Sequence, residues 1–394
     1  MNRENFPEII LKADRDRHVK NKHPWVFMGA VQDFPDFEPG AVLKVLTSQG
    51  EFVGFGYFNK TQSIAGRMFS FEETDPYQTI RESIVSAIKL RKQVIPKDTS
   101  AYRIINGEGD RLPGLVVDKY GDVLVLQINT LGIEKLKPLI IETLQEEMGK
   151  FPIFEKCSTA TRKKEGLKDI EEWTVGKGNE PVAITEHGLK FNVSFTGMQK
   201  TGFFLDQREM RQLVRNYAKN KSVLNCFSYT GGFSVYALAG GAKKADSVDT
   251  AEIAQAQAKV NFELNGFSTT TNSFFTEDVA DFLSSKVKQG DYDFIILDPP
   301  AFAKRASDIP NASRGYREIN RLAMQKLASG SFLLTSSCSS HINRELFQTI
   351  IFQAAKDAKR KVKIISGHSL AADHPLDLFY PEGDYLKSLL LYIE

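Results

Sequence analysis

The sequence predicts an α/β protein whose C-terminal half folds as a doubly wound, mostly parallel sheet. Four apolar runs of strand length carry this prediction, and stretches of helical length separate them; the runs lie at 222–226, 245–249, 294–298 and 332–335. Parallel strands that are buried on both faces are continuous apolar runs, so this alternation is typical of an open sheet covered by helices. The chain contains no internal repeat, which excludes a solenoid.

Two smaller domains are expected before this sheet, because 394 residues are enough for two or three domains with separate cores. Residues 8–72 show short apolar and aromatic alternation broken by turn signals, which predicts a small β-barrel. A helical pattern over 80–94, followed by strand-like runs and a second helical stretch at 133–148, predicts a small α+β unit. The expected domains are the barrel at 1–73, the α+β domain at 74–185 and the doubly wound domain at 186–394.

Composition and charge exclude several classes of protein. The 51 Lys and Arg residues nearly balance the 49 Asp and Glu residues, so the chain is neither a polybasic coat nor an acidic disordered protein. No apolar run approaches the roughly 20 residues of a membrane helix, and the N-terminus lacks the features of a signal peptide, so we expect a cytoplasmic protein. Cys157, Cys226 and Cys338 form no CxxC pair, which disfavours disulfides and a zinc site, and we expect no metal.

The first strand of the predicted sheet runs into a turn that is typical of a ligand site. The adjacent Gly231 and Gly232 allow a ligand to approach the backbone where the first helical N–H groups are unbonded. The G-x-G-x-x-G and P-loop patterns are absent, which disfavours a pyrophosphate ligand and leaves an NAD-dependent oxidoreductase as a distant alternative. Asp249 ends the second strand near the spacing of about 20 residues at which an acid binds ribose hydroxyls.

S-adenosylmethionine combines an adenosine and a free ribose with no phosphate, so these features predict a methyltransferase. Asp278 either faces the adenine amine or caps a helix over 279–283, and both interpretations stay open. The polar and aromatic run at 200–208 is either part of the cofactor site or the start of an amphipathic helix. The expected cofactor-binding residues are Phe204, Asp206, Arg208, Phe227, Tyr229, Thr230, Gly231, Gly232, Asp249, Asp278, Asp298 and Pro299.

The run 298–302, Asp-Pro-Pro-Ala-Phe, follows the third of these strands at the edge where ligands of open α/β sheets bind. Its two prolines stiffen the backbone and hold Asp298 and Phe302 towards a planar substrate. Loops of this kind clamp a flipped base in amino-methylating enzymes. The motif therefore predicts methylation of a base without indicating which atom receives the methyl group.

Cys338 follows the next strand at the same edge, in a hydroxyl-rich run, although a lone cysteine is more often a packed structural residue. Carbon 5 of a pyrimidine is a poor nucleophile, so an enzyme first adds a thiolate to carbon 6. Cys338 supplies that thiolate if its pKa is lowered, and Asp298 then hydrogen-bonds a protonated cytosine N3. Cys157 and Cys226 are expected to be packed thiols. Methylation of an exocyclic amine or ring nitrogen is the alternative, and it needs no thiol.

A cluster of cations beside aromatic residues occurs in the expected barrel, as on RNA-binding surfaces. A solvated face around a buried Trp25 is the alternative interpretation. The expected RNA-binding residues are Lys12, Arg15, Arg17, Lys20, Lys22, Trp25 and Phe302. A further alternative is a non-catalytic RNA- or ribosome-binding protein that uses the methyltransferase fold only as a scaffold.

These motifs together resemble the bacterial 23S (large-subunit) rRNA 5-methylcytosine methyltransferases that carry an N-terminal PUA domain. The likeness runs nearly end to end and includes 23–27, 102–108, 112–114, 200–208, 225–234, 298–302, 314–320, 337–339, 373–375 and 380–383. The resemblance implies a PUA barrel, a central α+β domain and a Rossmann-like class I methyltransferase domain, with S-adenosylmethionine as methyl donor and Cys338 as nucleophile. It also implies 23S rRNA or its large-subunit precursor as partner, and it leaves a homodimer open.

Overall fold

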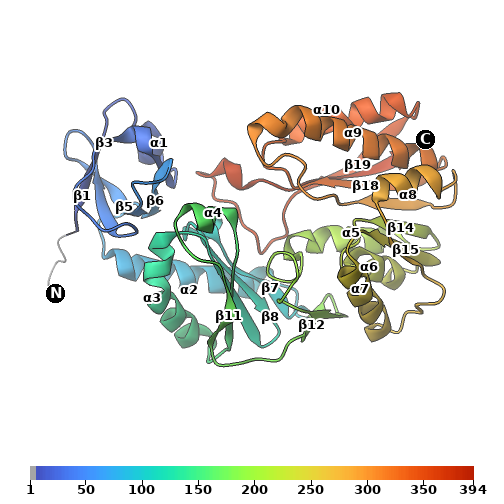
Figure 1. Ribbon diagram of the computed structural model, residues 1–394, viewed down its shortest axis with the longest axis horizontal. Helices are drawn as coiled ribbons and strands as arrows, with labels where there is room; N and C mark the ends of the chain where they lie inside the picture. Colours follow the sequence, from blue (N-terminus) through green and yellow to red (C-terminus); the bar gives the residue numbers. More distant parts are fainter. Residues whose placement is uncertain (1–5) are drawn as a thin grey trace. The chain divides into compact units, whose positions relative to one another are not determined.

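The computed structural model describes residues 6–394, which form two units (Figure 1). The first unit contains the residues up to 184 together with 193–203 and 372–383, and the second contains 185–192, 204–371 and 384–394. Segments that are distant in the sequence therefore complete each unit. No helix within the described range is long and apolar enough to cross a membrane.

The N-terminal part of the first unit is a six-stranded sheet in the order β2-β6-β5-β4-β1-β3, and it confirms the β-rich structure expected there. The strands are β1 (Glu8–Leu11), β2 (Trp25–Phe27), β3 (Val31–Asp33), β4 (Val42–Leu46), β5 (Phe52–Phe58) and β6 (Ile64–Ser70), and the short helix α1 (Arg17–Lys20) follows β1. Gly66 must lack a side chain, because a Cβ atom there would lie 2.2 Å from the buried Phe58 ring.

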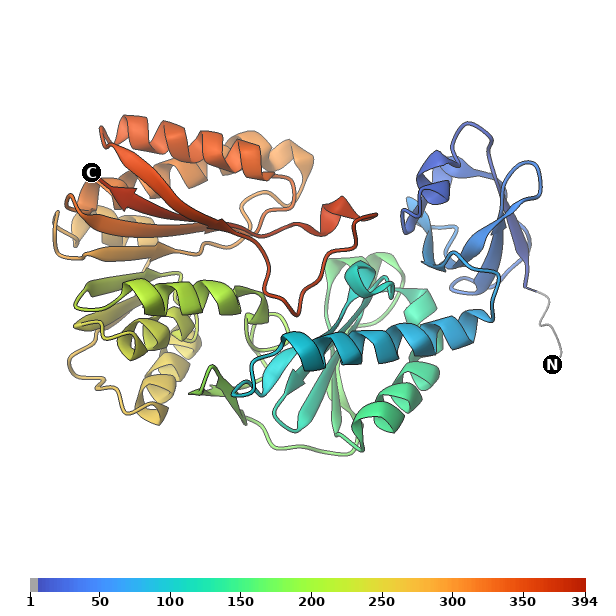
Figure 2. The same ribbon diagram turned by 180° about the vertical axis from the view of Figure 1, so that it is seen from behind.

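The central part of the first unit is a five-stranded sheet in the order β11-β10-β9-β8-β7, with two long helices packed together beside it (Figure 2). Asp75 caps the first of these helices by accepting from the N–H of Tyr77, and the buried Ile80, Ile84 and Ile88 form its apolar stripe. The elements are α2 (Pro76–Val94), β7 (Ala101–Asn106), β8 (Leu115–Tyr120), β9 (Val123–Ile128), α3 (Leu131–Met148), β10 (Ile153–Cys157), α4 (Ala160–Lys164) and β11 (Ile170–Val175).

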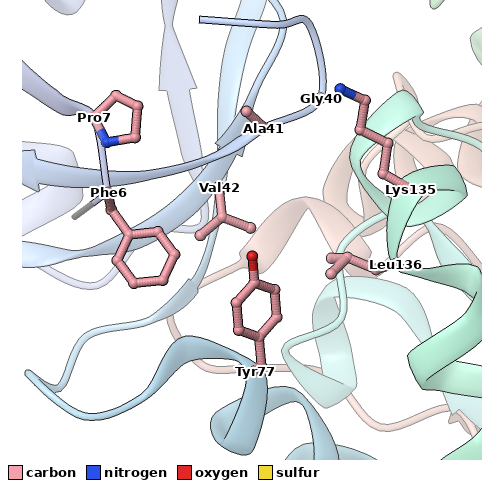
Figure 3. Close-up of a pocket in the computed structure, with 8 residues that line it drawn as sticks. All are labelled: Phe6, Pro7, Gly40, Ala41, Val42, Tyr77, Lys135 and Leu136. Atoms are coloured by element: carbon pink, nitrogen blue, oxygen red, sulfur yellow. The ribbon is translucent and has the colours of Figure 1, made fainter. Parts of the chain in front are cut away.

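A cavity of about 490 Å³ lies within the first unit, where β4 faces the ends of α2 and α3 (Figure 3). Its lining is mostly apolar and consists of Phe6, Pro7, Gly40, Ala41, Val42, Tyr77, Lys135 and Leu136. None of these residues belongs to the predicted cofactor or catalytic set, so this cavity is separate from the predicted chemistry.

The second unit contains a seven-stranded sheet in the order β16-β15-β14-β17-β18-β20-β19, which confirms the predicted doubly wound arrangement. The first five of these strands are parallel, whereas β20 is antiparallel to both of its neighbours. The strands are β14 (Ser222–Cys226), β15 (Lys244–Asp249), β16 (Phe274–Thr276), β17 (Phe294–Leu297), β18 (Ser331–Ser337), β19 (Val362–His368) and β20 (Lys387–Ile393). A two-stranded sheet of β12 (Val182–Glu186) and β13 (Leu189–Val193) precedes them in the sequence.

Helices cover both faces of this sheet because neighbouring strand residues point to opposite sides. Val223 packs in a core with α5 and α6, whereas Leu224 packs in the other core with α8, α9 and α10. The helices are α5 (Arg208–Tyr217), α6 (Gly232–Ala239), α7 (Glu252–Leu264), α8 (Val279–Ser285), α9 (Ile309–Lys326) and α10 (Arg344–Asp357).

Glu186, the last residue of β12, has a completely buried carboxylate that forms ion pairs with two arginines of α5. Glu186 accepts two hydrogen bonds of 2.7 Å from the guanidinium of Arg211, and Arg208 lies 3.3 Å away. Burial opposes the ionisation of Glu186, but the two arginines more than offset it, so its pKa is lowered. A lowered folded-state pKa means that this contribution to stability is present at neutral pH and is lost as pH falls through that pKa.

We predict that Glu186→Gln lowers the free energy of unfolding by about 3–5 kcal/mol, because it leaves two buried guanidinium groups beside a neutral amide. The measurement is a urea titration at neutral pH followed by circular dichroism. Glu318→Gln is the matched control, since Glu318 forms an exposed pair with Arg321, and such pairs contribute about 0–1 kcal/mol. Equal losses in the two variants would contradict the role given to Glu186.

Candidate functional site

The parallel register brings the predicted chemical groups to one edge of the seven-stranded sheet. Cys226 at the end of β14 is level with Val248 in β15 and Leu297 in β17, and Leu297 is level with Thr335 in β18. The loops that follow these four strands therefore start at the same edge. Ligands of open α/β sheets bind at this carboxyl edge.

The turn after β14 has an unusual backbone conformation. Phe227, Tyr229 and Gly231 all have positive φ angles, of 58°, 47° and 76°. Bulky residues rarely adopt this left-handed region, and such residues concentrate at ligand sites. Gly231 must be a glycine on packing grounds as well, because a Cβ atom there would lie 2.9 Å from Cβ of Ala258.

Asp249 is fixed by two backbone groups at the end of β15. One of its carboxylate oxygens accepts from the N–H of Tyr229 at 2.8 Å, and the other accepts from the N–H of Ala251 at 2.9 Å. Each carboxylate oxygen has capacity for a second hydrogen bond, and the side chain is half-buried. This arrangement fits a ribose whose two hydroxyls donate to one acid.

Two buried amides of α7 support the same turn, and sequence reasoning missed both. Gln255 donates to the hydroxyl of Ser228 at 2.9 Å, and Asn261 donates to the carbonyl of Thr230 at 2.9 Å. Both lie on the buried face of α7 together with Ala258. Each amide lies three residues from Ala258 along the helix, so a polar residue at helical spacing from a buried alanine was the signal that could have identified them.

Asp278 caps α8 in this structure. Its carboxylate accepts from the N–H groups of Ala280 at 2.8 Å and Asp281 at 3.1 Å, which is the helix-cap interpretation of this residue. A contact between Asp278 and an adenine amine stays a prediction.

The run that precedes α5 reaches the site through three neighbouring side chains. The Phe204 ring meets the Tyr229 ring edge-on at 5.1 Å, and the Tyr385 hydroxyl donates to the buried carboxylate of Asp206 at 2.6 Å. Gln207, which the sequence did not single out, donates to Asp298 at 2.8 Å.

The Arg208 side chain is 0 % exposed and lies against Glu186. Its contact in this structure is therefore a buried ion pair, and its role in cofactor binding stays a prediction.

The Asp-Pro-Pro-Ala-Phe loop after β17 is held from both sides. Gln207 donates to Asp298 at its start, and at its end the Phe302 ring packs at a tilt of 39° against Tyr316 of α9, with centroids 4.5 Å apart. The next residue, Ala303, donates its N–H to the Ser339 hydroxyl at 3.2 Å. These contacts link the loop to the residues that flank Cys338.

Cys338 lies directly after β18 and differs from the other two cysteines in its environment. Its thiol is 3.7 Å from the carbonyl oxygen of Pro299, and the residue is half-buried. Cys157 and Cys226 are buried, as expected for packed thiols. Burial raises the pKa of Cys157 to about 12 and raises that of Cys226 further. Of the three cysteines, Cys338 is therefore the one that is partly exposed at the carboxyl edge.

Five cations and Trp25 are the RNA-binding residues predicted in the N-terminal part of the chain. The cations are exposed, and they are Lys12, Arg15, Arg17, Lys20 and Lys22.

Trp25 is half-buried instead: its indole donates to Glu108 at 2.9 Å and its ring packs on Tyr380 at 5.0 Å. These contacts give Trp25 a packing role within the first unit, and its contact with RNA stays a prediction.

Comparison with known proteins decides the family. A model of S-adenosylmethionine-dependent methyltransferases matches residues 161–359, and a model of PUA-like domains matches residues 9–71. The ribosomal RNA large subunit methyltransferase I of Vibrio parahaemolyticus is 42% identical over 390 residues, which cover 96% of this chain and 97% of that protein. The Photobacterium profundum protein of the same name is 39% identical over 98% of this chain and 99% of its own length. This chain belongs to the ribosomal RNA large subunit methyltransferase I family.

Membership of the family confirms the predicted methyltransferase, with S-adenosylmethionine as methyl donor and a PUA-like domain at the N-terminus. SMU.776, solved in complex with SAH, has the same fold: the TM-score is 0.83 at 24% identity, over 98% of this chain and 100% of that one. The class I methyltransferase fold predicted from the sequence is thereby confirmed. Of the predicted cofactor-binding residues, Asp249 has a carboxylate that two backbone N–H groups hold in place, and its contact with the donor stays a prediction.

We predict that Asp249→Asn weakens S-adenosylmethionine binding about 10- to 100-fold. The asparagine amide lacks the negative charge that strengthens the hydrogen bonds of Asp249 to the ribose. A hydrogen bond to a charged group contributes about 1.5–3 kcal/mol. Isothermal titration calorimetry measures the affinity. Asp281→Asn, at an exposed position of α8, is the matched control and should bind like the wild type. Unchanged affinity of Asp249→Asn would contradict the assignment.

Proposed function

We propose that this protein methylates carbon 5 of a cytosine in 23S (large-subunit) ribosomal RNA, with Cys338 as the nucleophile. Relatives over nearly the whole chain are named ribosomal RNA large subunit methyltransferase I, which supports the substrate class. The position of Cys338 is the observation that favours carbon 5 over a ring or amine nitrogen as the methylated atom. Its half-buried thiol follows the strand next to β17, at the edge where Asp249 and Asp298 also lie.

Methylation at carbon 5 requires a nucleophile, because this carbon is not reactive enough by itself. The Cys338 thiolate forms a bond to carbon 6, and the electron pair of the 5,6 double bond moves towards carbon 5. S-adenosylmethionine, when bound, supplies the methyl group. After the proton on carbon 5 is removed by a base, the carbon–sulfur bond breaks and the thiolate is regenerated.

Asp298 has the position to bind the cytosine ring in this scheme. Gln207 holds one of its carboxylate oxygens at 2.8 Å, and the following two prolines restrict the backbone. A proton on N3 neutralises the negative charge that builds up on the ring when the thiolate adds, and the Asp298 carboxylate holds this proton by accepting a hydrogen bond from N3. Asp298 therefore orients the base and favours the adduct.

Access of the enzyme to carbon 6 requires an unstacked base. A flipped or unpaired cytosine exposes both faces of its ring, which a base inside an RNA helix does not. The exposed cations of the N-terminal part of the chain, among them Arg17 and Lys22, contact phosphates of flanking RNA in this proposal. The PUA-like domain in this proposal holds RNA, while the second unit carries out the reaction.

Nitrogen-directed methylation is the second candidate, and the Asp298-Pro299-Pro300 loop favours it, since this kind of loop occurs in amino-methylating enzymes. Such a reaction needs no thiol, so Cys338 would then be dispensable. A non-catalytic scaffold is the third candidate. The Asp249 carboxylate held by two backbone N–H groups argues against it, and absence of S-adenosylmethionine binding at millimolar concentration would favour it.

We predict that Cys338→Ala reduces methyl transfer by at least ~10³-fold, the order of loss seen when a nucleophile is removed. The assay follows labelled methyl from S-adenosylmethionine to undermodified 23S rRNA, and mass spectrometry identifies the labelled nucleoside. Cys157→Ser, in the buried β10, is the control and should retain activity.

Wild-type protein should form 5-methylcytidine in this assay. A methylated nitrogen as the product, with Cys338→Ala still active, would overturn the proposal in favour of the second candidate.

A further inference from the structure

A buried lysine lies behind the loop that carries Cys338. Lys387 is the first residue of β20 and is level with Ser337, the last residue of β18. Its side chain extends into the interior, since the residue is 1 % exposed. A buried ammonium is uncommon because removing the charge from water is unfavourable, so its surroundings indicate what the charge does.

The ammonium of Lys387 holds two backbone carbonyls. It donates to the carbonyl oxygen of Ser339 at 2.7 Å and to that of Tyr385 at 2.8 Å. Both oxygens are neutral, so these bonds fix the loop without cancelling the positive charge. Cys338 therefore lies between Ser337, which is level with Lys387 on the adjacent strand, and Ser339, which Lys387 binds directly.

The other side of the same loop is fixed by hydroxyl contacts. The Tyr316 hydroxyl lies 3.0 Å from the hydroxyl of Ser339, which also accepts the Ala303 N–H. Two residues before Cys338, within β18, the hydroxyl of Ser336 lies 2.8 Å from that of Ser388. The backbone is therefore fixed on both sides of Cys338, and the Lys387 ammonium provides one of these contacts through the Ser339 carbonyl.

Burial and three neighbouring groups shift the pKa of Lys387. Burial lowers the pKa of Lys387 to about 8, while Asp384 and Cys338 act to raise it and Arg344, the first residue of α10, lowers it further. The electrostatic interaction between two groups is reciprocal. Because a Cys338 thiolate favours the protonated form of Lys387, protonated Lys387 equally favours the thiolate form of Cys338. Below about pH 8 Lys387 is mainly protonated, and this effect is present; above it the effect is lost.

We propose that Lys387 is a positioning residue that holds the Cys338 loop through the Ser339 carbonyl and stabilises the Cys338 thiolate. This inference rests on the proposed function only where it gives the thiolate a role as nucleophile. The ionisation of Cys338 is a property of the protein alone and can be measured without RNA or methyl transfer.

The test is the pH dependence of Cys338 alkylation by iodoacetamide in the full-length protein, quantified by mass spectrometry of the peptide. The wild-type midpoint should lie below the ordinary thiol pKa of about 8.5. Lys387→Met should raise the midpoint by about one pH unit and slow alkylation about tenfold at pH 7, since a nearby opposite charge shifts a pKa by roughly 1–3 units. Lys387→Arg should retain most of the wild-type behaviour because it keeps the charge.

Lys363→Met is the matched control, because Lys363 is an exposed lysine on β19 that forms an ion pair with Glu394. It should leave the midpoint unchanged. Equal midpoints for wild type and Lys387→Met, or a wild-type midpoint at or above about 8.5, would overturn the inference. If Lys387→Met does not fold, as judged by circular dichroism, the wild-type midpoint and Lys387→Arg decide the question.

Methyl transfer then separates this inference from the proposed function. Lys387→Met should lower kcat at neutral pH, recover part of the loss at higher pH, and leave KM for RNA unchanged. A shifted alkylation midpoint together with an active Cys338→Ala would refute the nucleophile while leaving the role of Lys387 in thiolate stabilisation intact. An unshifted midpoint together with an inactive Cys338→Ala would refute the role of Lys387 in thiolate stabilisation while leaving Cys338 as the nucleophile.

Discussion

The register of β14 between β15 and β17 is the constraint on which the site depends. The chain proceeds from β14 outwards to β15 and β16 on one side, and continues with β17 and β18 on the other, so the strand order reverses beside β14. Ligands of open α/β sheets bind at such a reversal, because the two loops that leave it diverge and open a crevice. Asp249 ends β15 and Asp298 follows β17, the two strands that flank β14. A slip of one residue would turn every side chain of a strand to the opposite face and separate these groups.

Most of the predicted cofactor-binding and catalytic residues lie in loops, and each loop is fixed by hydrogen bonds to a neighbouring element. The amides of Gln255 and Asn261 hold the turn that contains Gly231, and Gln207 holds Asp298. Tyr316, Ala303 and Lys387 all contact Ser339, the neighbour of Cys338. Catalytic groups need positions that vary by less than about 0.5 Å, which exposed loops do not provide by themselves. Buried polar contacts supply this rigidity, and the same contacts account for polar residues in an otherwise apolar interior.

The sequence predicts those parts of the fold whose cause is local. Apolar runs of strand length identify β14, β15, β17 and β18, and the double glycine identifies the turn before α6, because chain conformation there depends on neighbouring residues. Contacts between distant segments leave no such local pattern. The antiparallel β20, the buried Lys387 and the amides of α7 depend on partners far along the chain, so they were not predicted. Trp25 shows the same limit: its sequence neighbours are exposed cations, whereas its hydrogen bond goes to Glu108, beyond the N-terminal sheet.

The covalent bond between Cys338 and the target cytosine is the central claim, and trapping that bond tests it most directly. In RNA that contains 5-fluorocytidine, carbon 5 carries fluorine in place of the proton that must leave, so the adduct cannot resolve after methylation. We expect a complex of protein and RNA that forms only with S-adenosylmethionine, survives denaturation, and yields a Cys338 peptide joined to the nucleotide. The absence of any such complex with active wild-type protein, or attachment to a different residue, would contradict the account.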